Sequence, residues 1–209
     1  MAVTRTLEDR GGPAGVPAVF LDKDGTLLVD VPYNVDPARM RLLPGAAEAI
    51  GRLDRAGYAL VVVSNQSGVA RGLFPPEALE AVGARLEELF ELAGARLSGF
   101  YFCPHLPGGK DPRYGVACDC RKPAPGLLLR AAGDLGIDLA ASWMLGDILD
   151  DVEAGNRAGC RSILVGDGHE TEWVLTPGRR PWGMAPDMTA AAGLVLLGAS
   201  MPARRRVKV

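Results

Sequence analysis

Short, continuously apolar runs alternate along the chain with longer segments in which apolar residues recur every three or four positions. Runs of the first kind are typical of strands buried on both faces, and segments of the second kind are typical of amphipathic helices. The predicted strands are residues 18–22, 58–64, 99–102, 142–145 and 161–165, and the predicted helices are residues 45–56, 75–93, 125–135, 150–158 and 190–198. This alternation predicts an α/β fold built on a doubly wound parallel sheet.

Two segments break the alternation. Residues 103–120 are rich in glycine, proline, cysteine and charge, and residues 167–188 carry glycine, proline and two tryptophans. Neither segment has a helical or a strand period, so both are predicted to be loops. Residues 1–16 are polar and glycine-rich, unlike a signal peptide, and are expected to form a flexible leader. We expect one domain over residues 17–200, followed by a basic, solvated tail at residues 201–209.

Composition narrows the classes of partner. The formal net charge is −2 at pH 7, which gives no field suited to nucleic acid, and no apolar stretch approaches the ~20 residues that span a bilayer. We therefore expect a cytoplasmic monomer that binds neither nucleic acid nor membranes. The four cysteines are then expected to be reduced rather than paired in disulfides. Cys160 stands apart from the other three and is predicted to be a small buried side chain.

Two aspartates follow the first predicted strand, in the run Phe20-Leu21-Asp22-Lys23-Asp24-Gly25-Thr26. A turn at Gly25 can direct both carboxylates toward one ligand. An ionised aspartate can act as a nucleophile on phosphorus at neutral pH, which splits a phosphoester hydrolysis into two easier steps. Such an attack requires that the charge of the phosphate be neutralised by a cation and a lysine nearby.

Groups of this kind follow the other predicted strands. Asp147 and Asp151 supply carboxylate oxygens, which suit Mg²⁺. Lys122 precedes a predicted helix N-terminus, where a phosphate is stabilised, and Ser64 offers a hydroxyl after a β-branched run. Because ligands of doubly wound sheets bind beyond the carboxyl ends of the strands, we expect these groups to converge on one site.

The four motifs together resemble those of the haloacid dehalogenase superfamily of phosphotransferases, with a match over residues 18–166. The resemblance implies a Rossmann-like fold, with Asp22 as the nucleophile and Asp24 as the general acid and base. It further implies that Ser64 and Lys122 hold the phosphoryl group. Asp147 would complete a Mg²⁺ site with the Asp22 carboxylate and the Asp24 backbone carbonyl, and Asp151 would support that site from outside it.

A second cluster of ligand-type side chains lies in the loop at residues 103–120, in the spacing Cys103-x-His105 followed by Cys118-x-Cys120. Three thiolates and one imidazole fit a closed tetrahedral Zn²⁺ site of the structural kind. The alternatives are cysteines scattered around a loop without a metal and a catalytic zinc, which would require an open position. A structural zinc would hold this long loop in place directly before Lys122.

Within the superfamily, the chain resembles the bacterial heptose-bisphosphate phosphatases and the histidinol-phosphatases. The run Asn65-Gln66-Ser67-Gly68-Val69-Ala70-Arg71-Gly72, the zinc spacing and Cys120-Arg121-Lys122-Pro123 carry this resemblance. It implies a capless enzyme that removes the 7-phosphate of D-glycero-D-manno-heptose 1,7-bisphosphate. The residues implied to contact this small phosphorylated metabolite are Asp30, Tyr33, Ser64, Asn65, Gln66, Ser67, Arg121 and Lys122.

The chain departs from the heptose-enzyme pattern at one position, and this leaves the substrate open. Ile148 stands where the heptose enzymes usually carry a lysine for the substrate phosphate, so the substrate stays open between the heptose bisphosphate, histidinol phosphate and another small sugar phosphate. Asp30 is compatible with either of the first two. A catalytically inactive phosphate-binding protein would have lost Asp22 or Asp24, and a phosphotransferase would need a second substrate pocket.

Overall fold

A computed structural model of the chain describes residues 2–4, 15–166 and 173–199. Most of the predicted leader, part of the 167–188 segment and the predicted basic tail lie outside the described residues. The strands are β1 (Ala2–Thr4), β2 (Ala18–Leu21), β3 (Ala59–Asn65), β4 (Leu97–Cys103), β5 (Trp143–Gly146), β6 (Arg161–Val165) and β7 (Gly183–Ala185). The helices are α1 (Ala46–Arg55), α2 (Ala78–Leu92), α3 (Gly126–Leu135), α4 (Leu149–Ala158) and α5 (Met188–Ala199). Short 3-10 turns lie at η1 (Pro37–Arg39), η2 (Leu139–Ala141) and η3 (Pro177–Arg179).

The strands form one sheet in the order β1-β4-β3-β2-β5-β6-β7. The six strands from β2 to β7 run parallel, and β1 pairs antiparallel to β4 at one edge. The chain leaves β2 toward β3 and β4 on one side, then returns to place β5 on the other side of β2. This reversal at β2 is the switch point at which doubly wound sheets bind their ligands.

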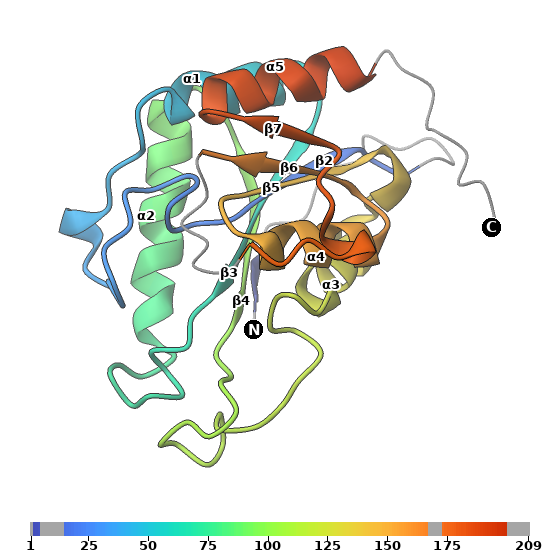
Figure 1. The fold of residues 1–209 in the computed structure, drawn as a ribbon. Coiled ribbons are helices and arrows are strands. Elements are labelled where there is room, and N and C mark those ends of the chain that lie inside the picture. The colour runs from blue at the N-terminus through green and yellow to red at the C-terminus, as the bar shows by residue number, and fades with distance from the viewer. Residues whose placement is uncertain (1, 5–14, 167–172, 200–209) are drawn as a thin grey trace.

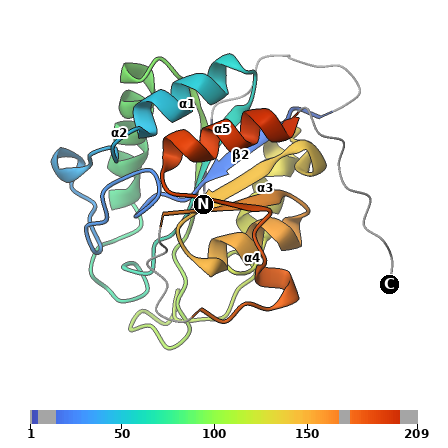
Figure 2. The same cartoon turned by 45° about the horizontal axis from the view of Figure 1, so that its top comes forward.

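Helices cover both faces of the sheet, as Figures 1 and 2 show. Helices α1, α2 and α5 pack on one face, and α3 and α4 pack on the other. Successive residues of β2 alternate between the two cores: Val19 and Leu21 face the first, whereas Ala18 and Phe20 face the second. Because both faces are buried, the strands are continuously apolar. The doubly wound parallel sheet predicted from the sequence is confirmed.

The predicted elements within the sheet all occur, with ends displaced by a few residues. The prediction was wrong for part of the 167–188 segment, which we expected to be a loop throughout. Gly183–Ala185 form β7, and α5 begins at Met188. Trp182 packs edge-to-face against the buried Trp143, with ring centroids 4.9 Å apart. This aromatic contact and the pairing with β6 decide the local structure, and neither is visible in a three-residue pattern.

Two further observations concern the ends and the surface. Residues 2–4, within the predicted leader, pair with β4, and the Val16 amide donates to the Gly136 carbonyl. The sheet therefore begins earlier in the chain than its first apolar run. Over the residues that the structure describes, every helix is too short or too polar to cross a membrane.

Candidate active site

The carboxyl ends of β2, β3 and β5 bring the predicted functional groups together. Asp22 follows β2 directly, Ser64 and Asn65 end β3, and Asp147 follows β5. The Asp22 amide donates to the Leu145 carbonyl at 2.9 Å, which continues the pairing of the two central strands up to the site. The parallel sheet therefore places these four groups at one edge, beside the switch point.

Lys122 reaches the same edge from the segment that precedes α3. Its side chain is buried and forms ion pairs with Asp22 and Asp151. Its Nζ also donates to the Val63 carbonyl at 3.2 Å. Burial lowers the pKa of Lys122, but the carboxylates of Asp151 and Asp22 raise it by more, and the net shift is upward. The ammonium is thus a fixed positive charge beside Asp22.

Asp151 belongs to the first turn of α4 and is completely buried. It accepts a hydrogen bond from the Ile148 amide at 3.4 Å, which holds the carboxylate over the start of the helix. The close approach depends on Gly146, because a Cβ at that position would lie 2.2 Å from Asp151 Cβ. The glycine of the Gly-Asp motif therefore makes room for the partner of Lys122.

Three carboxylates form a possible cation site. One oxygen from each of Asp22, Asp147 and Asp151 can be chosen so that all three lie within 4.8 Å of one another. Thr26 Oγ1 donates to Asp147 Oδ1 at 2.9 Å and so orients that carboxylate. An all-oxygen set of this kind fits Mg²⁺, which prefers hard ligands. The Asp24 side chain, by contrast, points elsewhere, so Asp24 could contribute to such a site only through its backbone.

The Asp24 carboxylate lies between two nitrogen donors. Lys23 Nζ is 2.5 Å from its Oδ1, and Gln66 Nε2 donates to its Oδ2 at 3.4 Å. Gln66 also donates to the Ser64 hydroxyl at 2.8 Å. Burial raises the pKa of Asp24, and this outweighs the neighbouring Lys23 ammonium, which acts in the opposite direction. A raised pKa favours the protonated form that a general acid requires.

Asn65 uses the oxygen and one N–H of its side-chain amide to bind the Lys122 main chain. Its Oδ1 accepts from the Lys122 backbone amide at 3.0 Å, and its Nδ2 donates to the Lys122 carbonyl at 3.1 Å. The end of β3 therefore holds the peptide groups on both sides of the Lys122 Cα. This contact across 57 residues of sequence could not be read from the motifs.

A cavity of about 230 Å³ opens beside Asp24. Five of the eight predicted substrate contacts line it: Asp30, Tyr33, Asn65, Gln66 and Ser67. The rest of the lining is Asp24, Pro32, Asn34 and Gly68. Tyr33 has a left-handed backbone with φ of 55°, which is strained for a residue other than glycine. The Arg71 guanidinium lies over its ring, 5.7 Å from the centroid. Tyr33 therefore lines the cavity, and Arg71 contacts the cavity only indirectly, through the Tyr33 ring.

Three predicted substrate contacts, Ser64, Arg121 and Lys122, do not line this cavity. Ser64 and Lys122 lie beside Asp24 and Asp22, whereas Arg121 turns toward the cysteine–histidine loop. Arg121 Nη1 donates to the His105 carbonyl at 3.3 Å. The side chain instead links the segment that carries Lys122 to the cysteine–histidine loop.

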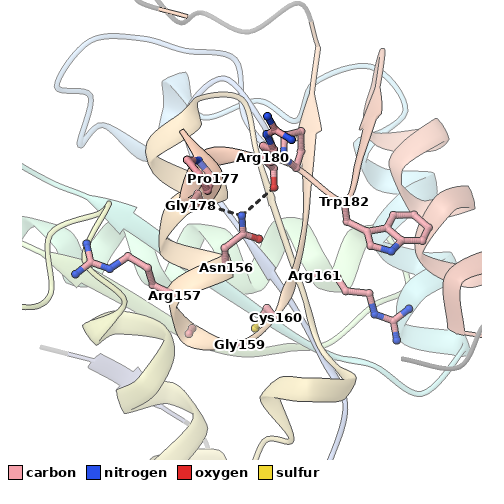
Figure 3. Close-up of a pocket in the computed structure, with 11 residues that line it drawn as sticks. Asn156, Arg157, Gly159, Cys160, Arg161, Pro177, Gly178, Arg180 and Trp182 are labelled. Atoms are coloured by element: carbon pink, nitrogen blue, oxygen red, sulfur yellow. Dashed lines mark hydrogen bonds between the residues drawn. The ribbon is translucent and has the colours of Figure 1, made fainter. Parts of the chain in front are cut away.

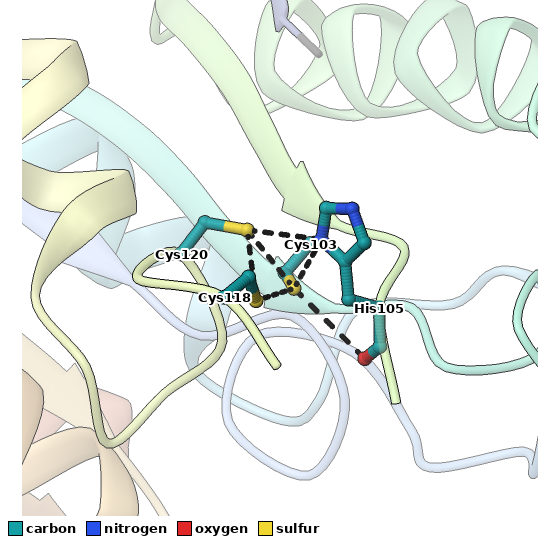
Figure 4. A group of neighbouring side chains, drawn as sticks. All are labelled: Cys103, His105, Cys118 and Cys120. Atoms are coloured by element: carbon teal, nitrogen blue, oxygen red, sulfur yellow. Dashed lines mark hydrogen bonds between the residues drawn. The ribbon is translucent and has the colours of Figure 1, made fainter. Parts of the chain in front are cut away.

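The four residues of the predicted zinc cluster converge (Figure 4). Cys120 Sγ lies 3.2 Å from Cys103 Sγ, 3.4 Å from Cys118 Sγ and 3.3 Å from His105 Nδ1. These distances are too long for a disulfide, which measures about 2.05 Å, and all four cysteines of the chain are free. A tetrahedral arrangement of three sulfurs and one nitrogen fits Zn²⁺.

The cluster is tied to the phosphate-site strands. Cys103 is the last residue of β4 and pairs in register with Asn65 of β3, and its carbonyl accepts from the Gln66 amide at 2.8 Å. The hydrogen bond between the Cys103 and Cys120 sulfurs lowers the pKa of Cys120 and raises that of Cys103, which favours a thiolate at Cys120. Lys122 follows Cys120 by two residues.

A second, larger cavity of about 840 Å³ lies at the amino end of β6, away from the carboxylates. Asn156 spans it, with hydrogen bonds of 2.9 Å from its Nδ2 to the carbonyls of Gly178 and Arg180 (Figure 3). Arg161 turns away to stack on Trp143 and to donate to a backbone carbonyl of α5. The polar groups here hold the 177–182 segment against α4 and do not form a reactive cluster.

Three residues at the site were missed by the sequence reasoning. Lys23 and Thr26 lie inside the first motif, and Arg71 lies in the run that carries the family resemblance, so the motifs contained the signal. Their partners Asp24, Asp147 and Tyr33 became apparent only in the fold.

Comparison with known proteins agrees with this geometry. Residues 119–191 match the family model described as HAD-hydrolase-like. The D-glycero-beta-D-manno-heptose-1,7-bisphosphate 7-phosphatase of Yersinia pestis is 43% identical over 169 residues, covering 77% of this chain and 90% of that protein.

Two solved structures extend the comparison. One, from Mesorhizobium loti and described as a HAD-like phosphatase, has a TM-score of 0.79 at 37% identity and covers 95% of this chain and 92% of its own. The D,D-heptose 1,7-bisphosphate phosphatase of B. bronchiseptica, complexed with magnesium and phosphate, has a TM-score of 0.72 at 34% identity and covers 87% and 98%. The chain therefore belongs to the heptose-1,7-bisphosphate 7-phosphatase family of haloacid-dehalogenase-like phosphatases and is a phosphoric monoester hydrolase.

Proposed function

We propose that the protein is a Mg²⁺-dependent phosphatase that acts through an aspartyl-phosphate on Asp22 and removes the 7-phosphate of D-glycero-β-D-manno-heptose 1,7-bisphosphate. The observation that carries the proposal is the convergence of Asp22, Lys122 and the carboxylates of Asp147 and Asp151 at the switch point. The names of the relatives support the substrate, and the magnesium and phosphate bound to the B. bronchiseptica enzyme support the cofactor.

In the first step, an oxygen of Asp22 attacks phosphorus and the bond to the sugar oxygen breaks. Asp24 gives its proton to the departing oxygen, and Lys122 and the Ser64 hydroxyl hold the phosphoryl oxygens. In the second step, Asp24 takes a proton from water, the water oxygen attacks phosphorus, and the bond to Asp22 breaks to release phosphate. Mg²⁺ held by Asp22, Asp147 and the Asp24 carbonyl would neutralise charge on the phosphoryl group throughout.

The sugar end of the substrate would occupy the cavity beside Asp24. Asp30, Gln66 and Ser67 offer hydrogen bonds to hydroxyls there, and Arg71, whose guanidinium lies over the ring of the lining residue Tyr33, offers a positive charge to a second phosphate. Ile148 caps α4 at the position where a lysine would otherwise be expected. Arg71 would therefore be the cation for the distal phosphate in this chain.

Histidinol phosphate is a second candidate substrate, favoured by one observation. The side chains that line the cavity include the acids Asp24 and Asp30 and, among the described residues, no base. An acidic lining suits a cationic alcohol. The two substrates carry opposite charges at their distal ends, so the charge at the cavity mouth distinguishes them.

We further propose that the cysteine–histidine cluster holds a structural Zn²⁺ and that the enzyme acts as a cytoplasmic monomer on this small metabolite. The sulfur and nitrogen donors are mutually close, and a fourth protein ligand leaves no open position for substrate. We expect the zinc loop at residues 103–120 to be part of a single phosphatase domain over residues 17–200, between a leader and a tail.

The replacement Asp22→Asn tests the nucleophile. It removes the charge and nucleophilicity of the carboxylate with almost no change in shape, and we expect phosphate release from p-nitrophenyl phosphate to fall by at least about 1,000-fold. Residual activity within tenfold of the parent would contradict the mechanism. A parallel screen of the heptose bisphosphate, fructose 1,6-bisphosphate and histidinol phosphate, measured as released phosphate, would identify the substrate.

A further inference from the structure

The backbone around Lys122 has little regular structure to support it. Lys122 lies between Cys120 and the start of α3, outside any helix or strand, yet its ammonium must meet Asp22 deep in the site. The long side chain has many rotamers, so the position of its Nζ depends on where the Cα is held. A catalytic lysine on irregular backbone requires a device that fixes that backbone.

The Asn65 amide is complementary to the Lys122 main chain. A primary amide offers one acceptor and two donors, and here the acceptor meets the Lys122 amide at 3.0 Å while one donor meets the Lys122 carbonyl at 3.1 Å. These two hydrogen bonds have the same pattern as the two N–H···O bonds that a directly opposed pair of residues exchanges in an antiparallel sheet. Asn65 itself is the last residue of β3, one of the central strands. Val63, two residues earlier on the same strand, accepts a hydrogen bond from Lys122 Nζ through its carbonyl.

We propose that Asn65 is a positioning residue, which sets the Lys122 ammonium against Asp22 by holding both peptide groups of Lys122, and that it is not a substrate-recognition residue. Asn65 borders the cavity, and on the family resemblance alone it was expected to contact the substrate. Its carbonyl oxygen and one amide hydrogen are engaged by Lys122, however, and these are the atoms that would otherwise read a sugar hydroxyl. The inference rests on the proposed function, because it presumes that Lys122 acts on the phosphoryl group.

The two roles predict different kinetics for Asn65→Ala. If Asn65 positions Lys122, every phosphomonoester suffers equally, because each uses the same ammonium. We expect kcat to fall on the order of 100-fold, the cost of misplacing a catalytic group by about 1 Å, by the same factor for p-nitrophenyl phosphate and for the heptose bisphosphate. KM should change by less than about threefold for both.

If Asn65 instead recognises the substrate, Asn65→Ala should change the kinetics of the two substrates differently. The loss would then be confined to the heptose bisphosphate, with KM raised and with p-nitrophenyl phosphate unaffected, because that compound has no sugar to contact. Either this result or an unchanged kcat for both substrates would overturn the proposal. The p-nitrophenyl phosphate arm does not depend on the identity of the natural substrate, and the effect of Asp22→Asn on the same compound tests the proposed function separately.

Asn156→Ala is the matched control. Asn156 also uses its amide to hold a loop, through two hydrogen bonds of 2.9 Å to backbone carbonyls, but far from the carboxylates. We expect it to lower the melting temperature while kcat stays within twofold. Should Asn65→Ala fail to fold, Asn65→Asp keeps the acceptor for the Lys122 amide and loses the donor; an intermediate loss of kcat, equal for both substrates, supports the proposal, and a loss for one substrate alone contradicts it.

Discussion

Lys122 Nζ lies 2.6 Å from Asp151 Oδ1, and both side chains are buried, with exposed fractions of 2% and 0%. The two residues belong to segments that are separate in the sequence, and the sheet brings these segments together at one edge. Desolvation of such a pair is costly, so its retention indicates that the ammonium is needed at this place, whereas stability alone would be served by apolar residues. Asp151 thus keeps Lys122 charged and directed at Asp22.

Replacing Asp151 by asparagine should therefore destabilise the protein. The change keeps the shape but leaves a buried ammonium with only Asp22 as its anionic partner, and we expect the free energy of unfolding to fall by about 3 kcal/mol. Urea denaturation followed by circular dichroism measures it. Asp111→Asn, which weakens the solvent-screened pair of Asp111 with Arg113, should leave the free energy of unfolding almost unchanged. Equal effects of the two changes would refute the buried-pair argument.

The proposed zinc site predicts that the stability of the protein depends on the metal. Cys118→Ser removes one of four ligands, and we expect the zinc content, measured by elemental analysis, to fall from close to one ion per chain. The melting temperature should fall with it, since loss of a structural metal commonly costs several kcal/mol.

Cys160→Ala is the control for a cysteine outside the cluster. Cys160 is buried against the core on the α3 and α4 face and lies outside the group formed by Cys103, His105, Cys118 and Cys120, and burial raises the pKa of its thiol to about 12. We expect the zinc content of this variant to be unchanged. A parent protein without zinc, and a Cys118→Ser variant as stable as the parent, would exclude the structural role.

Arg71 tests the charge of the distal group of the substrate. Arg71→Ala should lower kcat/KM for the heptose bisphosphate by about tenfold, the equivalent of one charge-assisted contact, and leave p-nitrophenyl phosphate unaffected. If the substrate is the cationic histidinol phosphate, the same change should raise kcat/KM. Arg113→Ala is the matched control: Arg113 also lies over a tyrosine, 5.5 Å from the Tyr114 centroid, but Tyr114 does not line this cavity, whereas Tyr33 under Arg71 does.

The central architecture was predictable because it depends on long, repeated signals. Each of the parallel strands from β2 to β6 is an apolar run, and the helices between them carry apolar faces, so the alternation determines a doubly wound sheet. The convergence of Asp22, Ser64 and Asp147 followed from the same alternation, because parallel strands all end at one edge. The convergence of Cys103, His105, Cys118 and Cys120 was predictable because cysteine and histidine are uncommon residues and all four lie within a short segment.

The parts that were not predictable depend on contacts between distant residues. The three residues of β7 have no period of their own and form a strand only because β6 and Trp143 lie beside them. From the sequence, the amide of Asn65 could equally have faced the substrate or the backbone. It binds the backbone because the segment before α3 passes beside the end of β3. Arg121, expected at the substrate, donates to a carbonyl of the zinc loop for the same reason.

Gly146 illustrates how volume can constrain a site as strictly as reactivity does. Its Cα faces Asp151 so closely that even a methyl group would overlap that side chain. In a saturation-mutagenesis screen, position 146 should therefore reject all nineteen alternatives. It should be as intolerant as position 22, the proposed nucleophile, although glycine supplies no functional group. A screen that ranks residues by lost activity would count it among the catalytic residues, and only the spatial arrangement explains why it belongs in a different class.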